Sequence, residues 1–201
     1  MAEMSRSADL ARKTGETDVR VSVALDDPAP REISTGVGFF DHMLELLARH
    51  GRLGLAVTVS GDLATGAHHT VEDTGIVLGQ AIDRALGDRR GIRRYGHAVV
   101  PMDEARAACA LDLSGRPYCA LSGLEIPAGV TGGFEHELTE EFLRAVASAA
   151  KATVHVDVEA GANAHHMIEA CFKAFARALR GAVAIDPEET GVPSTKGTLN
   201  S

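Results

Sequence analysis

Two copies of one short motif, a pair of histidines followed three residues later by a glutamate, carry the residue types that bind divalent metals. They are His68-His69-Thr70-Val71-Glu72 and His165-His166-Met167-Ile168-Glu169. At about 100° per residue on an α-helix, the first histidine and the glutamate share one side, while the second histidine turns aside. Each copy therefore predicts ligands for two different ions. A single copy would be equally consistent with a polar helix start, but two matched copies favour a dimetal site.

The sequence around the two motifs repeats with the same 97-residue offset that separates His68 from His165. Residues 57–62 and 154–159 alternate apolar and polar side chains, which is typical of half-buried strands. Apolar residues at helical spacing follow each motif and stop near Gly87 and Gly181, which predicts two helices with C-terminal glycine caps. An earlier helix is expected in each half, because residues 41–47 pair with residues 140–146 if one loop differs by two residues.

The repeat predicts an α+β fold with an internal duplication: two similar units, each a small mixed sheet with helices on one face, fused around a pseudo-twofold axis. Residues 19–25 are expected to open the first half as a strand, as residues 95–101 and 105–113 do in the second. We divide the chain into a first repeat unit, 1–92, and a second unit with a C-terminal tail, 93–201. No linker rich in Gly, Ser or Pro separates them, so one compact domain is expected.

The aligned halves add one ligand upstream of each motif, His42 in the first half and Glu141 in the second. Imidazole and carboxylate ligands without thiolate favour Mn²⁺, Fe²⁺ or Zn²⁺ over Ca²⁺, and a duplicated set with open octahedral positions favours Mn²⁺. The other histidines, His50, His97, His136 and His155, lie outside the repeat and are expected to be structural or superficial. The predicted metal ligands are His42, His68, His69, Glu72, Glu141, His165, His166 and Glu169.

Composition excludes several classes of function. The formal net charge is −8, which disfavours a general nucleic-acid or anionic-membrane surface. No run approaches the roughly 18 apolar residues of a membrane span, and residues 1–19 lack the apolar segment of a secretory signal, so a cytoplasmic location is expected. Cys109, Cys119 and Cys171 have no metal-site spacing and are expected to be reduced.

Six further segments have a distinctive residue order. They are Arg12-Lys13-Thr14-Gly15-Glu16-Thr17, Phe40-Asp41-His42-Met43-Leu44, Arg94-Tyr95-Gly96, Asp112-Leu113-Ser114-Gly115-Arg116-Pro117-Tyr118, residues 172–180 and Pro193-Ser194-Thr195-Lys196-Gly197. With the two histidine motifs, and in this order along nearly the whole chain, they resemble the imidazoleglycerol-phosphate dehydratase family. One segment alone would be a weak signal, whereas the ordered set is specific.

The resemblance implies a hydro-lyase of L-histidine biosynthesis that converts imidazole glycerol phosphate to imidazole acetol phosphate and water. It implies a fold like ribosomal protein S5 domain 2, two Mn²⁺ ions per active site held by the eight ligands above, and a 24-subunit homo-oligomer with sites between neighbouring subunits. Glu16 is the implied proton shuttle, with Glu169 as a second catalytic carboxylate. The implied contacts to the substrate phosphate are Arg94, Arg116, Ser194, Thr195 and Lys196.

Two positions depart from the family pattern. Glu141 stands where many relatives have histidine, and Leu46 replaces a polar residue that many relatives carry. A carboxylate suits Mn²⁺, so the site is expected to survive, with His136 as the alternative ligand. Two other functions remain open at this point. A dimetal phosphate-ester hydrolase would release inorganic phosphate, and a metal-buffering or metal-assembled protein would leave Arg94, Arg116 and Lys196 without a role.

Overall fold

Two four-stranded sheets of the same strand order dominate the computed structural model, which describes residues 6–199. The elements of the first half are β1 (Ser7–Lys13), β2 (Thr17–Ala24), β3 (Arg31–Ser34), α1 (Gly38–Gly51), β4 (Gly54–Gly61), the short helix η1 (Leu63–Thr65) and α2 (His68–Leu86). Those of the second half are β5 (Tyr95–Met102), β6 (Ala105–Asp112), β7 (Tyr118–Gly123), β8 (Val130–Thr131), β9 (Phe134–Glu135), α3 (Leu138–Ala149), β10 (Thr153–Ala160) and α4 (Ala164–Val183).

The sheet topologies confirm the predicted duplication. The first sheet has the order β1-β2-β4-β3 and the second β5-β6-β10-β7. In both, the first strand is antiparallel to the second and the second to the third, whereas the last strand is parallel to the third. The α+β class, with two similar mixed-sheet units, is therefore correct.

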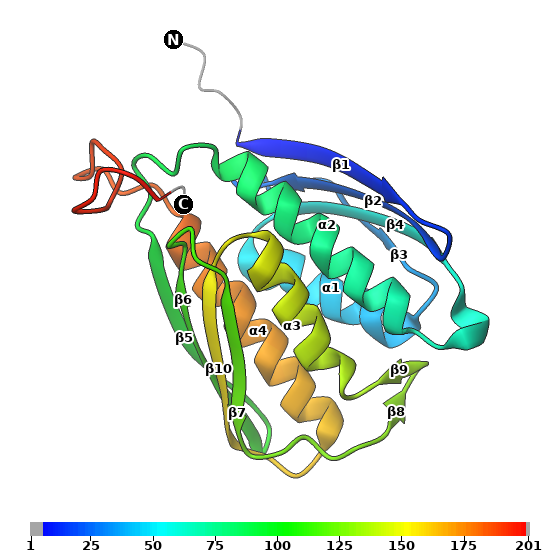
Figure 1. Cartoon of the computed structure of the whole chain (residues 1–201). Helices are drawn as coiled ribbons and strands as arrows, with labels where there is room; N and C mark the ends of the chain where they lie inside the picture. The colour runs from blue at the N-terminus through cyan, green and yellow to red at the C-terminus, as the bar shows by residue number, and fades with distance from the viewer. Residues whose placement is uncertain (1–5, 200–201) are drawn as a thin grey trace.

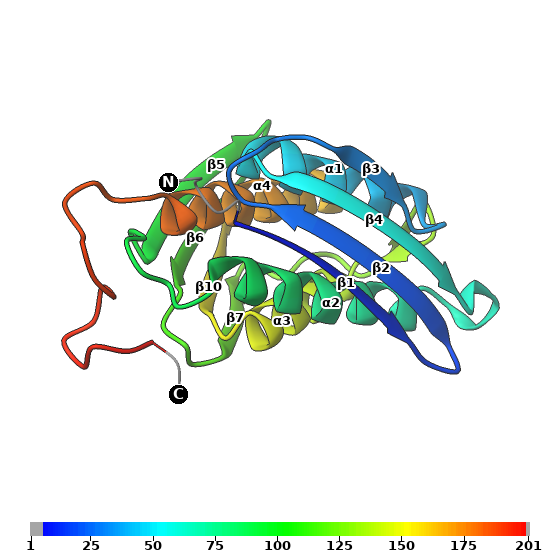
Figure 2. The same ribbon diagram turned by 90° about the horizontal axis from the view of Figure 1, so that it is seen from above.

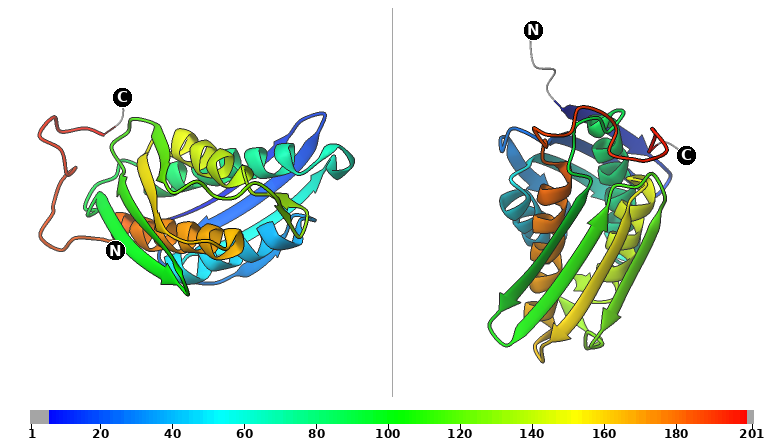
Figure 3. Two further views of the ribbon diagram at one scale, coloured as in Figure 1. Left: turned by 90° about the horizontal axis from the view of Figure 1, so that it is seen from below. Right: turned by 90° about the vertical axis from the view of Figure 1, so that its left-hand side faces the viewer.

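The four helices lie between the two sheets, which form the outer layers (Figure 1). Helix α2 packs on β1 and β2 and α1 on β3, whereas α4 packs on β5 and β6 and α3 on β7. Figure 2 shows the first sheet over α1 and α2, and the right-hand view of Figure 3 shows the second sheet in front of its helices. The halves meet through their helices, because α1 contacts α4 and α2 contacts α3.

Alternation of side chains explains the inner faces of the sheets. The valines at positions 19, 21 and 23 of β2, and at 154, 156 and 158 of β10, are buried, and the residues between them are more exposed. Successive side chains of a strand point to opposite faces, so the valine face of each sheet covers the helices. These residues belong to one hydrophobic core that runs through both halves.

Two glycines on α2 let that helix approach α3 closely. A Cβ at Gly75 would lie 2.8 Å from the Cβ of Ala145, and one at Gly79 would lie 2.6 Å from the carbonyl oxygen of Val146. Any side chain at these positions would push the helices apart. The close packing brings Glu72 on α2 and Glu141 on α3 to the border of one groove.

Two local predictions are wrong. Strand β1, rather than the predicted strand at residues 19–25, opens the first half. Gly87 does end α2, but Gly181 lies inside α4, which continues to Val183. The last turn of α4 needs no glycine cap because the N–H groups of Arg93 and Arg94 donate to the carbonyls of Ala184 and Ala182. Within residues 6–199, no helix has the length and apolar character required to cross a bilayer.

Candidate active site

Three predicted ligands converge between α1 and α4. The Nε2 atoms of His42 and His165 lie 3.0 and 2.9 Å from one oxygen, Oε1 of Glu169. Among the described residues 6–199, these three form a group whose ligand atoms all lie within 4.8 Å of one another. Two imidazoles and a carboxylate at this spacing could hold a divalent metal ion.

The carboxylate of Glu169 is the buried member of this group. Burial opposes its ionisation, yet hydrogen bonds with Lys173, His42 and His165 outweigh that effect and hold the pKa of Glu169 at about 2. Its second oxygen, Oε2, accepts from the ammonium of Lys173 one helical turn later. Glu169 is therefore an anion at neutral pH, as a metal ligand must be.

The repeat-related group lies between α2 and α3 and is more open. His68 Nε2 is 3.9 Å from Glu72 Oε2, and Glu141 on α3 lines the same groove as Glu72. Helix α3 thus brings Glu141 to the helix of this motif as α1 brings His42 to that of the other, but the side chains of His68, Glu72 and Glu141 do not converge as those of His42, His165 and Glu169 do. Its carboxylate lies 2.7 Å from Nη1 of Arg144, which also pairs with Glu140. Arg144 would have to release Glu141 for that oxygen to bind a metal.

Substitution at Glu141 should change metal content in a graded way. Glu141→His provides an imidazole donor and is expected to keep two ions per site. Glu141→Ala removes a donor and is expected to lower the affinity for one of the two ions by about 10- to 100-fold. Glu140→Ala is the matched control, since Glu140 is the other partner of Arg144. Metal analysis after dialysis measures the difference. Parent-like retention by Glu141→Ala would remove Glu141 from the ligand set.

The second histidine of each motif turns away from its neighbour. The rings of His68 and His69 are 5.9 Å apart and inclined by 87°, and those of His165 and His166 are 5.9 Å apart and inclined by 85°. His69 contacts Asp62, and His166 contacts Glu104. Neither carboxylate was predicted from the sequence, because nothing in the motif spacing connects residue 104 with residue 166. The hydrogen bond with His166 lowers the pKa of Glu104 to about 2, and that with His69 lowers the pKa of Asp62.

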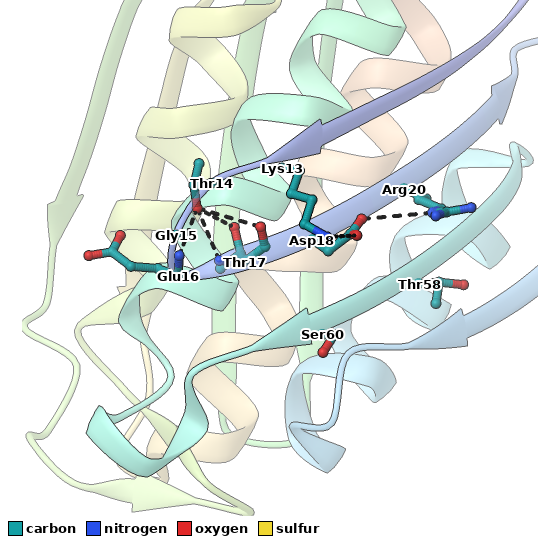
Figure 4. A pocket seen from close by; sticks show the side chains of 9 residues that line it. All are labelled: Lys13, Thr14, Gly15, Glu16, Thr17, Asp18, Arg20, Thr58 and Ser60. Atoms are coloured by element: carbon teal, nitrogen blue, oxygen red, sulfur yellow. Dashed lines mark hydrogen bonds and ion pairs between the residues drawn. The ribbon is translucent and has the colours of Figure 1, made fainter.

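Glu16 lies in the turn between β1 and β2, with its side chain 57% exposed. Its Oε1 is 3.7 Å from Nε2 of His69. Figure 4 shows its carboxylate pointing away from Asp18 and Arg20, which line the hollow beside the turn. The turn is tied to α2, because the buried Asp73 pairs with Arg12 and accepts a hydrogen bond from Thr17. The exposed Glu16 side chain is thus carried by a turn that is anchored to α2.

The predicted phosphate contacts gather at the other end of the molecule. Arg94 donates from Nε and Nη2 to Asp112 at 2.7 and 3.1 Å, and from Nη1 to the carbonyl of Pro193 at 2.9 Å. It therefore anchors the tail that carries Ser194, Thr195 and Lys196. Among residues 6–199, neither Arg116 nor Lys196 makes an ion pair with an acidic side chain, and both are exposed. Their positive charges are available to an anion.

The candidate metal ligands and the candidate phosphate contacts are far apart within one chain. Arg94 binds the carbonyl of Ala182 near the end of α4, whereas His165 lies at the start of that helix. The 20 residues of α4 span about 30 Å at 1.5 Å per residue. The tail accordingly lies at the opposite end from the start of α4 (Figure 1). One small molecule cannot reach both groups in the same chain.

Both ring nitrogens of His136 are used in hydrogen bonds. Its Nδ1 lies 2.7 Å from the carbonyl oxygen of Pro127 and its Nε2 lies 2.9 Å from Oγ1 of Thr131, and the residue is buried. No ring nitrogen is left for a metal, which favours Glu141 over His136 as the ligand from the second half. Cys109, Cys119 and Cys171 are free thiols, as expected.

Comparison with known proteins identifies the family. The model of imidazoleglycerol-phosphate dehydratase matches residues 35–179. The imidazoleglycerol-phosphate dehydratase of Moorella thermoacetica is 56% identical over 197 residues, covering 98% of this chain and 100% of the relative. The chain belongs to the imidazoleglycerol-phosphate dehydratase family. The relative from Bacillus cereus is 55% identical over 194 residues, covering 96% of this chain and 100% of its own length.

Solved structures of imidazoleglycerol-phosphate dehydratases share the fold. That from Staphylococcus aureus aligns with a TM-score of 0.81 and 40% identity, covering 90% of this chain and 99% of its own. That from Pyrococcus furiosus aligns with a TM-score of 0.81 and 35% identity, covering 94% and 99%. The resemblance predicted from the motifs is confirmed. The chain is an enzyme of the hydro-lyase class, acts on a small phosphorylated substrate and belongs to histidine biosynthesis.

Proposed function

We propose that this chain dehydrates imidazole glycerol phosphate to imidazole acetol phosphate at a dimanganese site completed by neighbouring subunits. The observation that carries the proposal is the separation of the two groups of candidate residues. The two histidine motifs lie where α2 and α4 begin, and the proposed phosphate contacts lie beyond the ends of these helices. An imidazole, a three-carbon chain and a phosphate together span only about 10 Å by ordinary bond lengths. The tail of one subunit must therefore meet the helix starts of another, as in a homo-oligomer of 24 subunits.

The ligand set fits divalent metal ions, on the chemistry of its donors. His42, His165 and Glu169 would hold one ion, and His68, Glu72 and Glu141 a second, with His69 and His166 of neighbouring subunits completing them. Hard carboxylate oxygens beside imidazole, without thiolate, favour Mn²⁺. When bound, such an ion supplies Lewis-acid polarisation of the substrate imidazole.

The side chains of this protein would supply binding and proton transfer. Arg116, Lys196 and the hydroxyls of Ser194 and Thr195 bind the phosphate, while Arg94 also holds the tail in place. Glu16 takes the proton from the middle carbon of the three-carbon chain. The hydroxyl on the carbon attached to the imidazole leaves with a proton as water, and the resulting enol becomes the ketone at the middle carbon. Glu169 is the second carboxylate beside the reacting ring.

The product tests the proposal directly. Purified protein loaded with Mn²⁺ is expected to form an enolisable ketone from imidazole glycerol phosphate while the phosphate stays attached. Chelation should abolish ketone formation, and added Mn²⁺ should restore it, because the imidazole is no longer polarised without the ion. Ketone absorbance in alkali and a phosphate assay are the two measurements. Release of inorganic phosphate would instead support the hydrolase, and full assembly without turnover would support a metal-buffering role.

A further inference from the structure

The second histidine of each motif is held by a carboxylate through the same ring nitrogen. Nδ1 of His69 lies 3.0 Å from Oδ2 of Asp62, and Nδ1 of His166 lies 2.7 Å from Oε2 of Glu104. The first histidine of the second motif differs, because His165 uses Nε2 toward Glu169 and no carboxylate hydrogen bond to its Nδ1 occurs among the described residues.

This contact selects one tautomer of the imidazole. An ionised carboxylate only accepts hydrogen bonds, so Nδ1 of His69 and of His166 must carry the proton. In a neutral ring the lone pair then lies on Nε2, the nitrogen on the far side from the carboxylate. In both rings Nε2 is therefore the nitrogen that can bind a metal ion, and it lies 3.7 Å from Oε1 of Glu16 in His69 and 3.7 Å from Oδ2 of Asp103 in His166.

The two carboxylates come from different places in the repeat. Asp62 follows strand β4, whereas Glu104 lies in the turn between β5 and β6. The repeat partner of Asp62 is Glu159, which pairs with Arg106 at 2.6 Å and does not contact His166. If the contact were only inherited from the duplication, the carboxylate would stand at the same repeat position in both halves. Instead, carboxylates from two different elements contact Nδ1 of the second histidine, which indicates that the contact between carboxylate and histidine is needed.

Both carboxylates are themselves fixed. Oε1 of Glu104 accepts hydrogen bonds from the backbone N–H groups of Asn163 at 2.8 Å and Ala162 at 3.3 Å, directly before α4. Asp62 accepts from the hydroxyl of Thr65 at 2.9 Å. Each carboxylate is thus held in place by its own hydrogen bonds. Rotation of the histidine ring would therefore break the hydrogen bond between the ring and the carboxylate.

We propose that Asp62 and Glu104 are positioning residues that fix the ring orientation and tautomer of His69 and His166 for metal binding. The inference rests on the ligand set of the proposed function. A carboxylate behind a ligating histidine orients the ring and raises its basicity. Asp62 and Glu104 act through their histidines and not on the substrate.

Metal affinity tests this assignment independently of turnover. Full-length parent, Asp62→Asn and Glu104→Gln proteins are stripped of metal and titrated with Mn²⁺ against a chromogenic chelator. Because His69 and His166 are expected to serve different ions, each variant should weaken one of the two classes of bound ion by about 10- to 100-fold and leave the other unchanged. Glutamine at position 104 keeps an acceptor for the backbone N–H groups, so the start of α4 is preserved.

Glu159→Gln is the matched control, because it removes the repeat-equivalent carboxylate without touching a histidine, and it should bind both ions like the parent. If the Asp62→Asn protein does not assemble, Thr65→Val is used instead, because it removes the hydroxyl that donates to Asp62. It should lower the affinity for the same ion by a smaller factor. Parent-like affinity in the Asp62 and Glu104 variants would overturn the assignment. If the parent forms ketone while the variants keep their affinity, only this inference fails; if the variants lose affinity but the parent forms no ketone, only the proposed function fails.

Discussion

A mixed oligomer of two inactive variants is expected to be active. His165→Ala removes a proposed metal ligand, and Arg116→Ala with Lys196→Ala removes two proposed phosphate contacts that make no ion pair with an acidic side chain among residues 6–199. Each protein alone should retain no measurable dehydratase activity. If a site takes its metal ligands from one subunit and its phosphate contacts from another, random mixing leaves both intact in about a quarter of the sites. Activity should therefore rise from near zero to about a quarter of the parent value.

Co-expression of the two variants with different affinity tags, followed by tandem purification and ketone assay, measures the rescue. Mixing His165→Ala with Glu169→Gln is the control, since both changes damage the same ligand group on the same helix. No site can then be intact, and no rescue is expected. Failure of the first mixture, in particles shown to contain both variants, would place the whole site in one chain and contradict the 30 Å separation along α4.

Replacement of Glu16 by glutamine is expected to lower kcat by about 10²- to 10⁴-fold, the usual contribution of a positioned acid or base. Glutamine keeps the size of the side chain and removes its ability to take a proton. Mn²⁺ content should stay at the parent level, because the Glu16 carboxylate lies 3.7 Å from His69 and is not in the ligand set. Steady-state kinetics together with metal analysis separates the two effects.

Asp18→Asn provides the control for this experiment. Asp18 lies on β2 close to the same turn and pairs with Lys13 at 3.5 Å, so the substitution removes a nearby carboxylate without changing Glu16. Its kcat should remain close to that of the parent. A Glu16→Gln protein that binds Mn²⁺ and turns over at the parent rate would exclude Glu16 from proton transfer.

The 97-residue repeat was enough to predict the fold class, because both histidine motifs and the strands before them are local patterns. Helices α2 and α4 begin at the predicted motifs, and the strands expected at residues 57–62 and 154–159 are present as β4 and β10. Strands β1 and β3 were missed. Ser7–Lys13 is mostly polar and lies at a sheet edge, and Arg31–Ser34 has only four residues, so neither gives a strong periodic signal.

The site itself was only partly predictable. Sequence spacing placed His165 and Glu169 on one helix face, and the repeat alignment added His42, which the structure brings beside them. The carboxylates of Asp62 and Glu104 were not foreseen, since tertiary packing alone brings Glu104 to His166 across 62 residues of sequence. The distance between metal and phosphate residues also depends on the direction in which α4 runs, which motif order does not reveal.

The helical layers between the sheets have a consequence for the origin of the chain. Each half covers only the outer side of its helices with its own sheet, and the inner sides are covered by α1 against α4 and α2 against α3. A single half of about 100 residues would leave this apolar surface open, and pairing with a second copy would close it. Such a symmetric ancestor would have carried two identical ligand groups. After fusion of the two copies into one chain, each half could accumulate its own substitutions. The equivalent positions 42 and 141 can therefore carry histidine in one half and glutamate in the other.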